Sequence, residues 1–452
     1  MQKRYRFLFT SPGFYGHIAP SLAVAKHLVA QGHRVGFATG SASRRMIEHA
    51  GIHDFFPRDA YQTCMDKITL SKSIYDYWPN IPRIFTPAAV KTMITELLAV
   101  FESFQPDVVY IDTMDLLSVA VADRFKLPYA HGCATSNFYL EKGIPPIGTR
   151  WDINSPRINR FKALLYIGFA APFMFWAYRN NMKVLRSIDK DWDTSGMLRG
   201  VSPYLYMLFS TDKLEYPRKV FIPEIFYVGP SLLEQNEGHL PDFPWEKLDT
   251  SKALIYVATG TIQYHTYRQL YHNIIKALVE DVFPGYIQVV MAVGKGQALE
   301  AFGALPSNFI VVPYAPQVKL LQRASVFITH GGANSVNEAL FYGKPLLVIA
   351  SGRDPISVAQ RVAYNGAGIS LKPGHATVRT IRRSIIELLN NPRYARAAEG
   401  VMASYRRCDG PRTAAGLILK LAESREPIRR RPGAPITLHH IDELPHYTDG
   451  TL

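Results

Sequence analysis

The feature that most constrains the fold is an alternation of short apolar strands and amphipathic helices that begins twice along the chain. In the first half, strands are predicted at residues 5–10, 34–39 and 107–112, with helices at 18–31 and 116–124. The same rhythm restarts after Lys252, with strands predicted at residues 253–258, 287–292, 309–312 and 325–329. Strands that alternate with helices form parallel sheets covered on both faces. The sequence therefore predicts an α/β protein of two doubly wound, Rossmann-like parallel-sheet domains that face each other across a cleft.

The length of 452 residues also favours two domains, because a single core rarely serves so long a chain. A stretch at residues 229–244 is rich in proline, glycine and polar residues, which marks a linker. We expect an N-terminal domain at 1–229, a linker at 230–250 and a second domain at 251–425. Residues 426–452 read as a basic, weakly structured tail.

Charge and cysteine content narrow the class of protein. The net charge is +14, but the basic residues are scattered and no nucleic-acid-binding motif is present, so no nucleic-acid partner is expected. The three cysteines lie far apart in the sequence and lack metal-binding spacing, which suits a reducing cytoplasm. Part of the positive charge lies at 425–431, where the alternatives are a solvated tail and attraction to anionic membranes.

No segment has the pattern of a signal peptide or a membrane span. The apolar run near the start covers only residues 7–9, too short for a signal-peptide core. The longest uncharged stretch, residues 163–178, is shorter than the roughly 20 residues that a spanning helix needs, and Pro172 interrupts it. We expect a cytoplasmic protein, with a peripheral membrane contact left open and a monomeric or homodimeric state.

A glycine-containing segment at residues 329–340 has the pattern of a phosphate-binding site. It follows a predicted strand and opens a helix, and Gly331 and Gly332 allow the backbone a sharp turn and a close approach to a ligand. The helix N-terminus then presents N–H groups and partial positive charge to an anion. Side chains that can add hydrogen bonds to phosphate or ribose oxygens are His330, Asn334, Ser335 and Glu338. The alternative is a glycine-rich connection to a capped helix.

The segment is part of a longer motif that begins at Tyr314-Ala-Pro-Gln317 and ends at Arg361-Val362. With it, the chain resembles the UDP-glycosyltransferase superfamily, the family 1 glycosyltransferases of GT-B fold, in their natural-product type. The resemblance implies that Tyr314 stacks on the uracil, that the Ala315 backbone pairs with the base edge and that Gln317 reaches the ribose. Stacking of an aromatic ring on a base is favourable for any base. Thr261, after the first strand of the second half, is the matching candidate for a diphosphate contact, with a turn as the alternative.

One position departs from the family pattern. The family carries an acidic residue followed by glutamine where this chain has Asp354-Pro355, and both residues contact sugar hydroxyls there. Proline has no side-chain donor. The resemblance therefore assigns Asp354 to the sugar, whereas Pro355 favours a different or deoxygenated sugar over glucose.

The loop after the first strand holds the candidate catalytic base, His17. It lies in the segment Ser11-Pro-Gly-Phe-Tyr-Gly-His17, at the edge where the strands of a parallel sheet end, and the family has its catalytic histidine in such a Gly-His loop. A hydroxyl nucleophile needs a base to remove its proton, and a carboxylate on the other imidazole nitrogen would fix the tautomer. Asp112 is the favoured partner and Asp115 its rival; helix capping is the alternative for each.

The acceptor region is expected to be apolar. Residues 133–178 are rich in aromatic and aliphatic side chains, and the equivalent region of the family shapes the acceptor pocket. The candidate acceptor-binding residues are Phe14, Met174, Phe175 and Trp176. Core packing is the alternative for each of them, whereas the whole region favours a lipophilic polyketide, terpenoid, carotenoid-like or flavonoid alcohol.

Together the motifs predict an inverting glycosyltransferase that moves a sugar from a nucleotide diphosphate-sugar, UDP or TDP, to a hydroxyl of a small apolar acceptor. The domain at 1–229 would bind the acceptor and that at 251–425 the donor. The nucleotide-sugar is a co-substrate, so no cofactor is expected, and no acidic cluster suggests a metal. The rival hypotheses are a nucleotide-sugar epimerase, a lipid-linked sugar transferase at a membrane surface and a non-catalytic sugar-binding protein.

Overall fold

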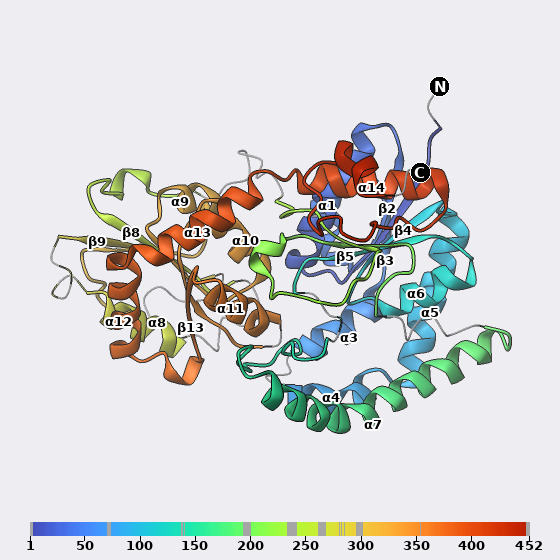
Figure 1. Ribbon diagram of the computed structural model, residues 1–452, viewed down its shortest axis with the longest axis horizontal. Helices are drawn as coiled ribbons and strands as arrows, with labels where there is room; N and C mark the ends of the chain where they lie inside the picture. The colour runs from blue at the N-terminus through green and yellow to red at the C-terminus, as the bar shows by residue number, and fades with distance from the viewer. Residues whose placement is uncertain are drawn as a thin grey trace. The chain divides into compact units, whose positions relative to one another are not determined.

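Figure 1 presents a computed structural model of the chain, which divides into two compact units. The first unit comprises Met1–Asp212, Pro217–Leu233 and Cys408–Leu452, and the second comprises Lys213–Tyr216 and Glu234–Arg407. The structure describes residues 3–448 apart from 70–73, 137–138, 140, 193–199, 233–241, 261–267, 280, 282, 284, 295–301 and 353.

The first unit is built on a parallel sheet of seven strands in the order β3-β2-β1-β4-β5-β6-β7. The strands are β1 (Arg6–Thr10), β2 (Arg34–Thr39), β3 (Asp54–Pro57), β4 (Val108–Asp112), β5 (Tyr129–Cys133), β6 (Leu205–Leu208) and β7 (Ile225–Tyr227). Their continuous apolar runs, such as Val108–Ile111, are buried on both faces, as parallel strands must be. The predicted strands at 5–10, 34–39 and 107–112 are confirmed to within one residue.

Helices cover both faces of this sheet. They are α1 (Tyr15–Ala30), α2 (Arg44–His49), α3 (Asp59–Thr69), α4 (Ile74–Ile84), α5 (Pro87–Phe104), α6 (Leu116–Arg124), α7 (Pro156–Ile188) and α14 (Gly410–Ser424). One core forms between the sheet and α1 with α14, and another forms between the opposite face and α3, α5 and α6. The long helix α7 packs on α4 and α5, outside that second layer (Figure 1).

Helix α1 ends as its sequence predicts but begins earlier. Gly32 takes a positive φ of 85°, and the N–H of His33 bonds to the carbonyl of Leu28, the hydrogen bond that closes a glycine-terminated helix. The helix starts at Tyr15 rather than at the predicted residue 18. His17 therefore lies in the first turn of α1 and not in the preceding loop.

The second unit repeats the architecture with six parallel strands in the order β10-β9-β8-β11-β12-β13. They are β8 (Ala253–Ala258), β9 (Ile287–Ala292), β10 (Phe309–Val312), β11 (Val326–Thr329), β12 (Leu346–Ile349) and β13 (Gly368–Leu371). The helices are α8 (Arg268–Ala277), α9 (Gln317–Arg323), α10 (Ala333–Phe341), α11 (Asp354–Tyr364), α12 (Val378–Asn390) and α13 (Pro392–Tyr405). Helices α9, α10, α11 and α13 pack on one face and α8 and α12 on the other.

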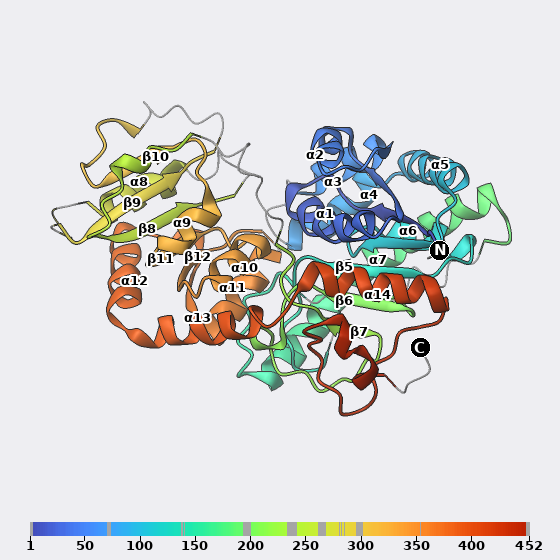
Figure 2. The same cartoon turned by 90° about the horizontal axis from the view of Figure 1, so that it is seen from above.

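The C-terminal segment corrects the predicted domain boundaries. Residues from Cys408 onward belong to the first unit, not to a second domain reaching residue 425. Figure 2 shows α14 and the chain beyond it running along the first unit, and α14 packs against α1. A Cβ atom on Gly410 would lie 2.4 Å from the carbonyl oxygen of Pro230, so glycine permits this close return of the chain.

Residues 426–448 are also packed rather than weakly structured. Ile428 and Leu438 are fully buried in the core beneath α1, and Tyr227 and Thr437 form a β-bridge. Arg429 forms an ion pair with Glu224. The Arg430 guanidinium lies 4.7 Å from the centre of the Phe221 ring. The apolar residues interspersed with the arginines thus anchor a segment whose charge alone suggested a solvated tail.

This packing predicts that Leu438→Ala destabilises the protein by about 2–5 kcal/mol, since the truncation removes buried apolar contacts and leaves a cavity. Chemical denaturation followed by tryptophan fluorescence measures the change. Val220→Ala, at a half-exposed position of the same unit, is the matched control and should have little effect. Equal stabilities for Leu438→Ala and the wild type would contradict the packed arrangement.

Candidate active site

The first unit brings His17 and Asp112 together at the carboxyl edge of its sheet. β1 and β4 are adjacent parallel strands, so the chain leaves both at the same edge. His17 Nδ1 lies 2.8 Å from Asp112 Oδ2, and only 2% of the Asp112 side chain is exposed against 17% for His17. The other carboxylate oxygen of Asp112 accepts a 2.9 Å hydrogen bond from the Met114 backbone N–H.

This geometry suits a general base. A carboxylate can only accept, so the hydrogen bond requires a proton on Nδ1 of His17. In the neutral imidazole, Nε2 then carries the lone pair that can accept a proton from a hydroxyl. The buried carboxylate would also stabilise the imidazolium that forms. The arrangement can therefore perform the proton abstraction expected of His17.

Asp115, the rival partner for His17, is engaged elsewhere. Its carboxylate forms an ion pair with Arg58, both side chains being fully buried, and accepts a 2.6 Å hydrogen bond from the Ser118 hydroxyl. It also caps α6 through the Ser118 N–H. The Asp115 backbone N–H donates to the Asp112 carbonyl at 2.8 Å, so this capped turn supports the loop that follows Asp112. The sequence gives no local signal for the role of Arg58, because its partner Asp115 lies 57 positions away.

The four candidate acceptor residues fall into two groups. The Phe14 ring centre lies 6.2 Å from that of His17, and Phe14 and Trp176 both pack against the core around α5. Met174 and Phe175 instead are 55% and 60% exposed on α7. Both side chains lie outside the cores of the first unit, and their acceptor role stays a prediction.

In the second unit, the residues of the predicted phosphate site lie at the start of α10. β11 ends at Thr329, and α10 begins at Ala333 with Gly332 as its N-cap. Gly332 has no side chain with which to cap this terminus, and a helix N-terminus of this kind can bind an anion through its N–H groups. Gly331 has φ = 92°, and a Cβ atom there would lie 2.8 Å from Val348 Cγ1, so both geometry and space require glycine.

His330 sits between two glycines at this helix terminus. Cβ atoms on Gly260 and Gly332 would lie 2.5 and 2.6 Å from its ring. Burial lowers the pKa of His330 to about 4, so the imidazole is neutral near pH 7. Its Nδ1 is buried and has no hydrogen-bond partner among the described residues. A neutral imidazole keeps one N–H that can donate to a phosphate oxygen.

Gln317, Ser335 and Glu338 form a connected polar group. Gln317 Nε2 donates to Glu338 Oε2 at 2.6 Å and to Ser335 Oγ at 3.3 Å, and the Tyr256 hydroxyl donates to Gln317 Oε1 at 3.3 Å. Burial raises the pKa of Glu338 to about 7, against the opposing effect of the Gln317 hydrogen bond. Gln317 and Glu338, 21 positions apart in the sequence, are thus hydrogen-bonded to each other, as two residues that contact the same ribose would have to lie close together.

The remaining predicted donor residues lie at the ends of nearby elements. Tyr314 is 40% exposed after β10, and Ala315 packs against the core below α9. Asp354 is the first residue of α11, and Asn334 lies in the first turn of α10. Thr261 falls outside the described residues. Arg361, at the end of the motif, is buried in an ion pair with Glu215 at 2.7 Å and therefore serves packing.

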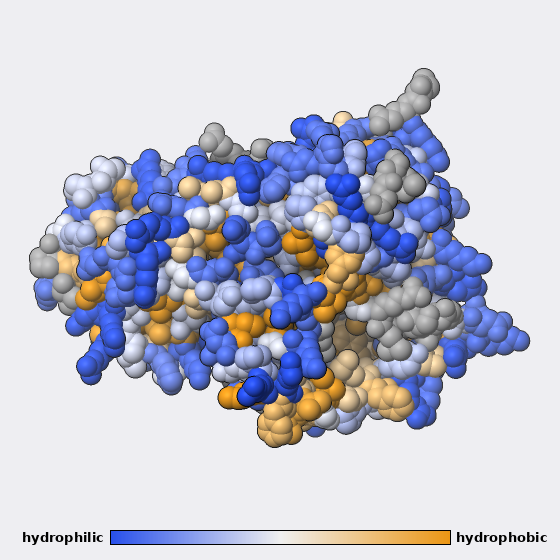
Figure 3. All heavy atoms as spheres, viewed as in Figure 1, coloured by the Kyte–Doolittle hydropathy of each residue, from blue (hydrophilic) through white to orange (hydrophobic). Residues whose placement is uncertain are grey.

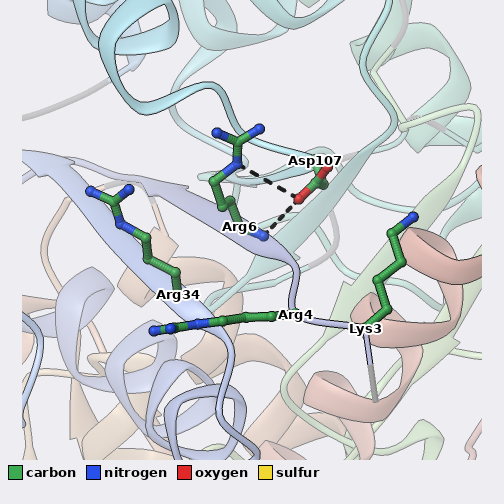
Figure 4. A pocket seen from close by; sticks show the side chains of 5 residues that line it. All are labelled: Lys3, Arg4, Arg6, Arg34 and Asp107. Carbon is green, nitrogen blue, oxygen red and sulfur yellow. Dashed lines mark hydrogen bonds and ion pairs between the residues drawn. The ribbon is translucent and has the colours of Figure 1, made fainter. Parts of the chain in front are cut away.

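An open hollow elsewhere on the first unit is lined by Lys3, Arg4, Arg6, Arg34 and Asp107 (Figure 4). It lies where β1, β2 and β4 begin, at the edge of the sheet opposite to His17. Asp107 accepts a hydrogen bond from the Arg6 backbone N–H, and Arg34 pairs with Asp54. The hollow therefore lies at the N-terminal ends of the strands and is separate from the candidate active site. In the described part of the chain, no group of three histidine, cysteine or acidic side chains is placed to hold a metal.

Comparison with known proteins agrees with this architecture. Residues 285–413 match the model of the erythromycin biosynthesis protein CIII-like C-terminal domain. The 4′-demethylrebeccamycin synthase of Lentzea aerocolonigenes is 29% identical over 395 residues, covering 85% of this chain and 91% of that protein.

Two solved structures share the fold. The glycosyltransferase of kitacinnamycin superposes with a TM-score of 0.74 at 21% identity, over 92% of this chain and 99% of that one. The glycosyltransferase VinC, in complex with dTDP, superposes with a TM-score of 0.64 at 19% identity, over the same 92% and 99%.

The two parallel α/β units thus have the GT-B fold, the class that these solved structures share. The motif between Tyr314 and Val362, the matching domain model and the rebeccamycin relative narrow this class further. These similarities identify the chain as a glycosyltransferase, and it resembles the family 1 enzymes of this class.

The His17–Asp112 hydrogen bond predicts that Asp112→Asn lowers kcat on the order of 10³–10⁴-fold, since the amide can stabilise the wrong imidazole tautomer and carries no charge. Steady-state kinetics of sugar transfer measure the effect, and calorimetry should find nucleotide affinity unchanged. Asp442→Asn, at an exposed position of the same unit, is the control. A kcat close to that of the wild type would separate Asp112 from the chemistry.

The raised pKa of Glu338 predicts a pH-dependent stability of the ligand-free protein. In the folded protein Glu338 has a pKa of about 7, whereas its ordinary value is 4.5, so the folded state holds the proton more tightly than the unfolded state. The free energy of unfolding therefore falls as the pH rises from 4.5 through 7. Glu338→Gln should remove this dependence and gain stability relative to the wild type at pH 8 more than at pH 5. Urea denaturation at both values tests it, with the exposed Glu246→Gln as control. Parallel pH profiles for wild type and Glu338→Gln would refute the assignment.

Proposed function

We propose that the protein transfers a sugar from a UDP-sugar to a hydroxyl of a small lipophilic acceptor with inversion at the anomeric carbon, and that His17 is the general base. The observation that carries this proposal is the 2.8 Å hydrogen bond between His17 Nδ1 and the buried Asp112 carboxylate. It leaves Nε2 as the proton acceptor in a side chain that remains partly exposed. General-base assistance of this kind is typically worth about 10²–10⁴-fold in rate.

The reaction is a single displacement. The acceptor hydroxyl gives its proton to Nε2 of His17 while its oxygen forms a bond to the anomeric carbon. The bond from that carbon to the diphosphate oxygen breaks, and the nucleoside diphosphate leaves with the electron pair. Since the nucleophile enters opposite to the leaving group, the anomeric configuration inverts.

The departing diphosphate gains negative charge, which the start of α10 is suited to stabilise. The N-terminus of this helix would offer N–H hydrogen bonds and a partial positive charge to the diphosphate. Neutral His330 can add one N–H, and Asn334 and Ser335 can add side-chain contacts. We propose that these groups act without a metal ion or cofactor, the nucleotide-sugar being a co-substrate.

The nucleoside would be held by the ends of β10, α9 and α10. Tyr314 offers an exposed aromatic face on which the base can stack. The Ala315 backbone would form hydrogen bonds with the edge of the base. Gln317 and Glu338 would contact the ribose hydroxyls. Glu338 accepts ribose hydroxyls best as a carboxylate. We therefore propose that donor binding favours its charged form and lowers its pKa. The dTDP in VinC makes thymidine diphosphate sugars the alternative donors to be tested.

For the sugar and the acceptor, we propose a chemical class and not a particular compound. Asp354 would contact sugar hydroxyls, whereas Pro355 supplies no side-chain hydrogen bond, which favours a sugar lacking one hydroxyl. Phe14 beside His17 and the apolar region that includes Trp176 favour a lipophilic alcohol. The rebeccamycin relative is named for a compound of natural-product biosynthesis, and we propose this setting, in the cytoplasm, for the present chain.

The test is a screen of UDP- and TDP-sugars against hydroxylated apolar acceptors, read by mass spectrometry and nucleoside diphosphate release. We expect release that depends on the acceptor and a product mass increased by one sugar. His17→Ala should lower kcat by at least about 10²-fold while nucleotide affinity stays unchanged. The exposed His53→Ala is the control.

Two outcomes would overturn the proposal. Conversion of the sugar nucleotide to an epimer without an acceptor would assign the chain to the epimerases. Wild-type kcat in His17→Ala would remove His17 from the mechanism.

A further inference from the structure

The outer face of α7 is an apolar stripe that no part of the described chain covers. Spaced three or four residues apart, its central residues lie on one side of the helix. They are Phe161, Leu164, Leu165, Gly168, Pro172 and Phe175, and all are exposed. The leucines and phenylalanines among them are 60–69% exposed. Figure 3 shows the apolar side chains of α7 at the lower edge of the view.

Basic residues continue the same stripe beyond both of its ends. Arg157 lies one turn before Phe161, and Arg179, Lys183 and Arg186 follow Phe175 at spacings of three and four. With Arg160 and Lys162, the helix carries six basic residues, and no acidic residue occurs between Asp152 and Asp189. Among the described residues, none of the six forms a salt bridge. Their charge is therefore not neutralised by the protein itself.

We propose that the outer face of α7, from Arg157 to Arg186, docks on an anionic lipid bilayer. The apolar centre, about 21 Å long at 1.5 Å per residue, would enter the level of the lipid headgroups. The basic ends would meet the anionic headgroups while their aliphatic stems cover apolar surface. This charge pattern distinguishes a lipid surface from a second copy of the chain, because two such faces would place like charges together.

The helix would lie along the surface rather than cross the bilayer. The stretch 163–178 was predicted to be too short for a span, but α7 continues through Pro172 and is long and apolar enough to cross a membrane by length and composition, with almost none of the apolar window buried in the protein. However, the opposite side of α7 packs against α4 and α5, where Ala170, Val184 and Leu185 are buried. The Trp78 indole N–H also donates to the Tyr166 hydroxyl at 3.2 Å. A crossing helix would have to give up these contacts. Docking is independent of the proposed transfer reaction.

The experiment is co-sedimentation of the full chain with vesicles of phosphatidylglycerol and phosphatidylcholine, compared with phosphatidylcholine alone. We expect binding to the anionic vesicles that weakens as salt rises. Phe161→Gln/Leu164→Gln/Leu165→Gln should reduce the partition coefficient by at least about tenfold. Tyr286→Gln/Ile386→Gln, also at exposed apolar positions, is the control and should bind as the wild type does.

A charge variant tests the second half of the pattern. Arg179→Gln/Lys183→Gln/Arg186→Gln should lose at least about tenfold in binding to anionic vesicles and part of the salt dependence, since three of the six basic residues of α7 remain. Lys372→Gln/Arg379→Gln/Arg396→Gln removes the same charge from exposed positions of the second unit and should not. Thermal melts establish whether each variant is folded. If the apolar variant does not fold, vesicle binding by the charge variant tests the proposal.

Three results would overturn the proposal. They are a wild-type protein that ignores anionic vesicles, equal losses in the α7 variants and their controls, and a dimer in light scattering that the apolar substitutions dissolve in the absence of vesicle binding. The last would identify a second copy of the chain as the occupant.

Discussion

The parallel pairing of β1 with β4 is the interaction on which the proposed catalytic pair depends. Thr10 stands opposite Ile111 in this pair, so both strands end at the same edge. Stacking of Phe9 between Phe37 and Tyr110, with ring centres 5.1 and 4.6 Å away, packs the strands from one face. His17 and Asp112, 95 residues apart, then need only short connections to meet at 2.8 Å. Buried apolar surface thus positions the two polar groups, and the hydrogen bond between them selects the tautomer.

In the second unit, strand pairing likewise positions the residues of the proposed phosphate site. Thr329 at the end of β11 stands opposite Ala258 at the end of β8, so Gly260 and His330 emerge side by side. The absence of a side chain at Gly260 leaves room for the imidazole, and the turn at Gly331 directs the chain into α10. The position of the neutral His330 beside the N-terminus of α10 results from sheet register and glycine placement. The chemistry of each unit is therefore a consequence of which strands are neighbours.

Much of this could be predicted because its signals are local. Apolar runs of four to six residues mark each strand, and the residues that follow them must lie at the sheet edge. The first turn of α1 was missed because Tyr15 and Gly16 lack a clear capping pattern. The return of the C-terminal segment to the first unit was missed for a different reason. Its arginines dominate the composition, whereas its anchors, Ile428 and Leu438, reveal their burial only once α1 and α14 are in place. Packing between segments that are distant in the sequence leaves no periodic pattern from which it could be predicted.

Because the C-terminal segment is packed on the first unit, its arginines differ in role from the basic residues of α7. In the C-terminal segment, Arg429 is paired with Glu224, and Arg430 is buried beside Phe221, so these charges serve the fold. On α7, six basic residues have neither acidic neighbours in the sequence nor salt bridges among the described residues. A helix whose inner side already packs on α4 and α5 gains no folding stability from large apolar residues on its outer side. Contiguous exposed apolar surface of this extent marks an interaction site more often than a monomer's surface. The outer face of α7 therefore has a composition that the stability of the first unit does not explain, and its flanking charge favours an anionic partner.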